Sequence, residues 1–154
     1  MSPTAEFRSD SPEHTREIAA ALGRVARPGD AVLLSGPLGA GKTCFVQGLA
    51  NGLGVTHAVR SPTFVLLARY PGRTPLVHLD LYRLEGRAAI EDLGVEEQLE
   101  DAVVAVEWGE KLANLWPQAL AVQLEETGTE ARRIAVRAEG AAADRLADWR
   151  EALG

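Results

Sequence analysis

The stretch "SGPLGAGKT", residues 35–43, decides how the rest of the chain is interpreted. Gly36, four further residues and then Gly41, Lys42 and Thr43 match the G-x-x-x-x-G-K-[ST] pattern of a phosphate-binding P-loop. Glycines permit the backbone angles by which successive N–H groups surround phosphate oxygens, and a following helix points its positive end at them. In such a loop the lysine reaches the β- and γ-phosphates and the threonine hydroxyl is a ligand of Mg²⁺. The stretch therefore predicts a nucleotide site.

The sequence on both sides of the loop supports this prediction. Residues 31–36 are apolar on both faces, as in a buried parallel strand, and apolar residues recur at helical spacing after Gly41. An ordinary glycine-rich turn between a strand and a helix is the alternative interpretation. The expected ATP-binding residues of this segment are Gly36, Leu38, Gly39, Ala40, Gly41, Lys42, Thr43 and Cys44.

Helical and strand patterns alternate along the remaining chain. Ser11-Pro12-Glu13 is typical of a helix start, and a last helix carries Leu146, Trp149 and Leu153 on one stripe. Between them the patterns predict a hairpin of residues 63–70 with 75–82, a helix over 88–101 interrupted at Gly94, a buried strand over 102–108 and a hairpin of 120–127 with 132–139. We expect a single P-loop ATPase domain, residues 1–154, of the α/β class. It is a three-layer P-loop NTPase-like domain in which flanking helices and β-hairpins accompany a mixed, mostly parallel sheet.

Composition and charge narrow the function classes. The 154 residues are 46% hydrophobic and 25% charged, which is ordinary for a soluble globular protein. We expect no secretory signal and no membrane helix. Because there is one cysteine, we also expect no disulfide framework, and a cytoplasmic protein fits best. A net charge of −6 makes strong direct nucleic-acid binding unexpected, so any RNA substrate would be held by a partner.

Two acidic residues at strand ends are candidates for the second metal-binding group. Asp80 ends "PLVHLD" and Glu107 ends "AVVAVE", and a P-loop protein usually holds Mg²⁺ with a carboxylate at the end of a neighbouring strand. Either acid would also be compatible with a side chain that faces solvent. The sequence does not decide which of the two is the direct ligand.

Other polar residues allow a functional and a plain interpretation. Ser61 and Thr63 precede a strand and suggest a switch segment, with a turn at a strand entry as the alternative. His78 alternates with apolar residues and is more typical of a packed strand histidine than of a ligand. Cys44 fits a small packing residue that is open to alkylation.

Two missing patterns reduce the alternatives. The chain lacks the Asn-Lys-x-Asp signature of guanine recognition, and Asp80 is followed by Leu-Tyr-Arg, unlike the corresponding segment of small GTPases. An arginine-rich lid, which small-molecule kinases use to enclose two substrates, is not evident either. A GTP switch and a small-molecule kinase are therefore less favoured.

The motifs together resemble the TsaE family (formerly YjeE), small bacterial P-loop ATPases of tRNA threonylcarbamoyladenosine synthesis. The resemblance covers roughly residues 11–140. Pro37 departs from the family, which commonly has Asp there, at a position that contributes mainly backbone. The matching pieces are "GPLGAGKT", "SPTF", "HLDLYRL", "EDLG" and "VEWGEK", in that order.

This resemblance implies an ATPase that docks on a TsaD–TsaB complex, which transfers the threonylcarbamoyl group to tRNA. Thr43 and Glu107 would hold Mg²⁺, while Asp80 would lie close to the metal and order the attacking water. Thr63 would belong to the switch segment. Lys42, Asp80 and Glu107 are the expected catalytic residues, and tRNA is contacted only through the complex.

The resemblance also assigns residues beside the nucleotide. Trp108 corresponds to the family's nucleotide-side tryptophan, with an ordinary core tryptophan as the alternative. Arg132 corresponds to an arginine near the nucleotide, but Arg133 leaves the register open. Tyr82 and Arg83 would serve the site or the docking surface. A small-molecule kinase and a non-catalytic ATP-binding regulator remain as alternative functions.

Overall fold

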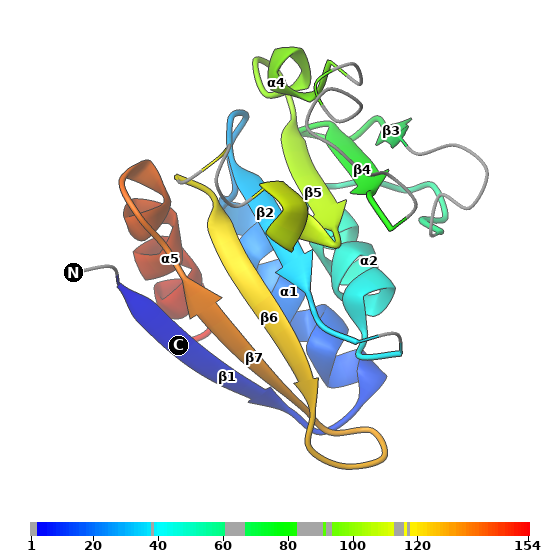
Figure 1. Ribbon diagram of the computed structural model, residues 1–154, viewed down its shortest axis with the longest axis vertical. Helices are drawn as coiled ribbons and strands as arrows, with labels where there is room; N and C mark the ends of the chain where they lie inside the picture. Colours follow the sequence, from blue (N-terminus) through cyan, green and yellow to red (C-terminus); the bar gives the residue numbers. More distant parts are fainter. Residues whose placement is uncertain are drawn as a thin grey trace.

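The computed structural model describes residues 3–37, 39–60, 67–82, 91, 94–112, 116 and 118–154. In these residues seven strands form one mixed sheet in the order β1-β7-β6-β2-β5-β4-β3 (Figure 1). The strands are β1 Thr4–Ser9, β2 Ala31–Ser35, β3 Leu67–Tyr70, β4 Leu76–Asp80, β5 Val103–Glu107, β6 Leu120–Glu126 and β7 Arg132–Arg137. Strands β6, β2, β5 and β4 are parallel neighbours, whereas β1, β7 and β3 are joined by antiparallel pairs.

Three helices cover one face of this sheet, and they lie behind it in Figure 1. The helices are α1 Pro12–Val25, α2 Lys42–Gly52 and α5 Ala141–Ala152. Helix α1 begins as its sequence predicts, because the Ser11 hydroxyl accepts a hydrogen bond from the His14 N–H at 3.0 Å. In α5 the wholly buried Trp149 donates its ring N–H to the Ile18 carbonyl at 2.9 Å, which joins α5 to α1.

The other face of the sheet is covered only in part by the described residues. The short helix α4 (Val95–Gln98) and the 3₁₀ turn η1 (Gly109–Leu112) pack Val95 and Leu112 against apolar residues of β2, β4 and β5. No helix in the described ranges is long and apolar enough to cross a membrane. In the described residues, the helices α1, α2 and α5 cover one face of the sheet, whereas on the other face the packed elements lie against β2, β4 and β5.

Most of the predicted elements are confirmed, and the misses are specific. The predicted α/β fold with a mixed sheet and flanking helices is present, but the described strands form three parallel and three antiparallel pairs where a mostly parallel sheet was predicted. The hairpin β6–β7 forms, and the hairpin β3–β4 forms from Leu67 on, because residues 63–66 lie outside the described residues. The strand β1 and the turn η1 were not predicted. The predicted apolar stripe of α5 is wrong at one position: Leu146 and Trp149 are buried, but Leu153 is 39% exposed because it lies beyond the helix end.

The parallel direction of β2, β5 and β4 determines where the polar residues meet. Leu34 near the end of β2 pairs with Glu107 at the end of β5, and Glu107 pairs with Asp80 at the end of β4. The loop that leaves β2 therefore starts at the same sheet edge as both carboxylates, which is where open α/β sheets bind ligands.

Helices α1 and α2 approach so closely that glycine is required between them. A Cβ on Gly48 would lie 2.6 Å from the Arg16 Cα, and one on Gly52 would lie 2.8 Å from the Gly23 Cα. Real Cβ atoms do not make such contacts, so these glycines keep α2 at a fixed place against α1.

We predict that Gly48→Ala destabilises the fold by about 1–3 kcal/mol, although alanine is the better helix former. Gly128→Ala is the matched control, because its Cβ would make an ordinary 3.4 Å contact with the Ala131 Cβ. Urea unfolding followed by circular dichroism measures both. Equal stability of the two variants would contradict the close α1–α2 contact.

Candidate functional site

The chain leaves β2 at Gly36 and enters α2 at Lys42, at the edge where β4 and β5 also end (Figure 1). Gly36, Gly39 and Gly41 have φ angles of 139°, 80° and 102°, a region that favours glycine. Gly41 is the residue before α2, and no side chain caps the helix there. The start of α2 thus keeps its N–H groups for another partner, as the motif predicts. Leu38 lies outside the described residues.

Lys42 is buried at the centre of this edge. Its Nζ donates to the carbonyls of Gly36 and Pro37 at 2.5 and 3.0 Å and lies 4.3 Å from the centroid of the Trp108 ring. Burial lowers the pKa of the lysine, and the nearby carboxylates of Glu107, Glu110 and Asp80 oppose this effect. The ammonium is thus positioned by two neutral oxygens and a ring face.

Glu107 connects three elements through its carboxylate. The Thr43 hydroxyl of α2 donates to Oε1 at 3.0 Å and Oε2 at 3.1 Å. The His78 Nε2 of β4 lies 2.6 Å from Oε2. The prediction of His78 as a packed strand histidine is right about its burial but missed this contact. The sequence does contain a signal for this contact: His78 stands two residues before Asp80, which puts both side chains on one face of β4.

Asp80, Tyr82 and Trp108 form the other side of the edge. Asp80 is opposite Glu107 in the strand register, and its Oδ1 accepts the Tyr82 backbone N–H at 2.9 Å. The rings of Tyr82 and Trp108 lie 5.0 Å apart. Trp108 is half-buried and packs against the apolar residues of β2, β4 and β5, while its ring faces Lys42. It therefore combines a core contact with a position beside Lys42.

These side chains surround one cavity of about 300 Å³. Ser61, Thr63 and Arg83, also predicted for the site, lie outside the described residues. The structure does bring together most of the other predicted residues. The cavity is lined by Gly39, Gly41, Lys42, Thr43, Cys44, Asp80, Tyr82, Glu107 and Trp108.

Arg132 is the arginine that reaches the loop. Its Nε donates to the Ala40 carbonyl at 3.0 Å, and its NH2 group donates to the Gly39 carbonyl at 3.3 Å. Arg133 has its closest carboxylates, those of Glu6 and Glu125, at 3.7 Å. Since successive residues of a strand face opposite sides of the sheet, only one of the two arginines can contact the loop. Arg132, and not Arg133, is therefore the arginine that contacts the loop, which the sequence left open.

The oxygen donors of the cavity fit a magnesium ion that shares its ligands with a phosphate. Thr43 and Glu107 offer a hydroxyl and a carboxylate within hydrogen-bond distance of one another, and Asp80 lines the same cavity. Mg²⁺ is commonly held by one or two carboxylates and completed by substrate phosphates and water. In the part of the chain that the structure describes, no group of three or more His, Cys, Asp or Glu side chains forms a metal cage.

Comparison with known proteins shows the family to which the chain belongs. The model of the family described as "Threonylcarbamoyl adenosine biosynthesis protein TsaE" matches residues 9–134. The chain belongs to the TsaE family. This family has its role in tRNA threonylcarbamoyladenosine biosynthesis. The TsaE match includes the whole cavity and Arg132.

Individual TsaE proteins are similar over most of their length. The chain is 41% identical to the tRNA threonylcarbamoyladenosine biosynthesis protein TsaE of Bacillus subtilis, over 88% of this chain and 86% of that protein. It is 43% identical to the protein of the same name from Streptomyces coelicolor, over 81% and 90% of the two chains. The crystal structure of Bacillus subtilis YdiB has a TM-score of 0.84 at 32% identity and covers 100% of this chain and 99% of its own.

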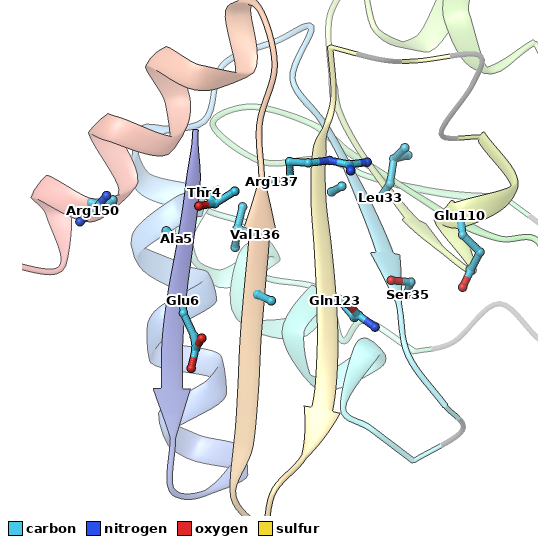
Figure 2. A pocket seen from close by; sticks show the side chains of 13 residues that line it. Thr4, Ala5, Glu6, Leu33, Ser35, Glu110, Gln123, Val136, Arg137 and Arg150 are labelled. Carbon is cyan, nitrogen blue, oxygen red and sulfur yellow. The ribbon is translucent and has the colours of Figure 1, made fainter. Parts of the chain in front are cut away.

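A larger hollow of about 690 Å³ lies elsewhere, against the sheet (Figure 2). Figure 2 shows side chains of β1, β7, β6 and β2 around it, among them Glu6, Arg137, Gln123 and Ser35. It shares no lining residue with the cavity beside Lys42. Size alone therefore does not select the candidate site; the convergence of loop, cation, hydroxyl and carboxylate makes the cavity beside Lys42 the candidate.

We predict that Cys44 is alkylated by iodoacetamide severalfold more slowly in the folded chain than in urea. Burial raises the pKa of the Cys44 thiol, and the neighbouring Arg16 opposes only part of this effect. Since the thiolate reacts, the rate should rise with pH, and its midpoint should lie at higher pH in the folded chain. Mass spectrometry reads this directly because Cys44 is the only cysteine.

The variant Arg16→Gln supplies the internal check. It removes the positive charge whose NH1 lies 3.3 Å from the Cys44 Sγ, so the midpoint should move to still higher pH. Identical rates in the folded and unfolded wild-type chain would contradict the prediction.

Proposed function

We propose that this chain is a Mg²⁺-dependent ATPase that supports formation of N6-threonylcarbamoyladenosine in tRNA by a TsaD–TsaB complex. The observation that carries the proposal is the contact between Thr43 and Glu107 directly beside Lys42 and the glycine-rich loop. Hydroxyl, carboxylate and lysine are the groups that nucleotide hydrolysis by a P-loop protein requires at one place.

Binding of the phosphates would use groups that the structure already directs toward the cavity. Backbone N–H groups of the loop and the uncapped start of α2 offer donors to phosphate oxygens. Lys42, which now donates to two loop carbonyls, would exchange these neutral acceptors for the β- and γ-phosphate oxygens. The ring of Trp108 limits the space above the lysine and would contact the nucleotide from that side.

Hydrolysis would depend on the acids at the ends of β4 and β5. Thr43 and Glu107 would hold the magnesium ion, which neutralises charge that develops on the phosphate oxygens. Asp80, opposite Glu107 in the register, would orient the attacking water. Because Lys42 and the loop fix the phosphates while Asp80 fixes the water, positioning supplies most of the catalysis.

ATP and a protein partner fit the remaining properties of the chain. The sequence has no Asn-Lys-x-Asp signature for guanine, which favours ATP. The net charge of −6 disfavours direct binding of tRNA, so the TsaD–TsaB complex would hold the RNA in the cytoplasm. The TsaE relatives in Bacillus subtilis and Streptomyces coelicolor carry the name of this pathway.

The first test is phosphate release from Mg-ATP by the chain alone and with TsaD and TsaB. Glu107→Ala should reduce turnover about a hundredfold or more while ATP still binds, because the carboxylate acts mainly on the transition state. Lys42→Ala should weaken ATP binding by about ten- to hundredfold through loss of charge-assisted hydrogen bonds. Glu125→Ala, which removes an exposed acid on β6, is the control and should change neither.

The outcomes separate the candidate functions. Turnover that TsaD and TsaB stimulate and that Glu107→Ala abolishes would support the proposal. ATP binding without turnover under any condition would favour a non-catalytic regulator. Stoichiometric transfer of the γ-phosphate to a metabolite would favour a kinase, and full hydrolysis by Glu107→Ala would refute the role given to that carboxylate.

We also expect Arg132→Ala to weaken Mg-ATP binding by about tenfold, whereas Arg133→Ala should leave it unchanged. The reason is that Arg132 holds the Gly39 and Ala40 carbonyls, so its loss loosens the loop before the phosphates arrive. Titration calorimetry measures both affinities. Equal losses in the two neighbouring variants would show that general charge, and not the loop contact, matters.

A further inference from the structure

A buried histidine lies beneath the carboxylate of Glu107. The side chain of His78 is completely buried, and that of Glu107 is 6% exposed. His78 Nε2 and Glu107 Oε2 are 2.6 Å apart, the shortest of the three polar contacts of this carboxylate in the described residues. The other ring nitrogen of His78, Nδ1, has no hydrogen-bond partner among those residues.

The strand register explains why these two side chains meet. His78 pairs with Ala105 and Asp80 pairs with Glu107, so all four side chains lie on the same face of the β4–β5 pair. This is the face that α2 covers, since Ala105 belongs to the same apolar cluster as residues of α2. The neighbour of Glu107 on this face of β5 is the small residue Ala105. The imidazole of His78, which pairs with Ala105, lies in the space beside the longer Glu107 side chain.

The hydrogen-bond chemistry gives the two oxygens of Glu107 different surroundings. Thr43 has one hydroxyl hydrogen, which it shares between Oε1 and Oε2 at nearly equal distances. His78 contacts Oε2 alone, with its Nε2–H as the donor to the carboxylate. Oε1, which in the described residues accepts only from the shared Thr43 hydroxyl, is therefore the oxygen with more acceptor capacity left toward the cavity.

We propose that His78 is a positioning residue for Glu107: its Nε2–H fixes Oε2, so that Oε1 is the oxygen presented to a metal ion beside Thr43. The inference rests on the proposed function. It extends the site by a group that contacts neither nucleotide nor metal but sets the orientation of a ligand, as outer hydrogen-bond partners of metal ligands commonly do. A histidine that only fills space would not need this orientation.

Three substitutions separate hydrogen bonding from packing. His78→Gln keeps an amide N–H at about the distance of Nε2 from the backbone, so it should still reach Oε2. His78→Asn has a shorter side chain whose amide stands nearer the position of Nδ1, so it should not. His78→Leu fills the space without any donor. If the leucine variant does not fold, the comparison of the asparagine and glutamine variants still tests whether the hydrogen bond is needed.

The readout is the affinity for Mn²⁺ of chain saturated with a non-hydrolysable ATP analogue, followed by electron paramagnetic resonance. His78→Leu and His78→Asn should weaken Mn²⁺ binding by about 10- to 100-fold, the usual cost of removing such a partner. His78→Gln should stay close to wild type. Affinity for the analogue in EDTA should not follow the same order, because phosphate binding without metal does not use the Glu107 orientation.

Two results would overturn the inference. Wild-type Mn²⁺ affinity in both His78→Leu and His78→Asn would refute it while leaving the proposed function in place. Equal loss of analogue affinity in EDTA for all three variants would show that His78 only packs. Absence of Mn²⁺ binding by the wild-type chain would overturn the proposed function together with the inference.

Discussion

The buried carboxylate of Glu107 is the constraint on which the arrangement of the site depends. A charge removed from water is costly unless hydrogen bonds compensate it, and a buried charged group that loses such a partner destabilises the fold. Here the compensation comes from Thr43 of α2 and His78 of β4, while Glu107 itself ends β5. The same contacts that make the charge tolerable therefore also fix the helix that starts at the loop against two strands of the sheet.

How much was predictable from the sequence depends on whether a feature is local. The strand and helix that flank the loop, the hairpin β6–β7 and the described part of the hairpin β3–β4 have all their signals within a few residues, and they were predicted correctly. The choice between Arg132 and Arg133 requires the register of β7 on β6, which no local pattern contains. The contact of His78 with Glu107 joins residues on two strands, so the sequence showed only its polar alternation.

The unpredicted strand β1 has a related explanation. Its residues alternate, with Phe7 facing the core and Glu6 facing out, but it is short, charged and at the edge of the sheet. Edge strands commonly carry charged side chains, which weakens the apolar pattern on which a prediction relies. Its pairing with β7 becomes evident only once the β6–β7 hairpin is in place, and that hairpin also carries the arginine that holds the loop.

The glycine contacts between α1 and α2 have a mechanical consequence for the cavity. Since α2 is in backbone contact with α1, the wall that carries Lys42 and Thr43 behaves as a rigid support. The aromatic side of the cavity differs from this support: Tyr82 is 53% exposed, and Trp108 has a φ of 61°, a left-handed conformation that is costly for a bulky residue. Among the described residues Trp108 is the one non-glycine residue with a positive φ, so backbone strain at this cavity is stored on its aromatic side and not on the side of α2.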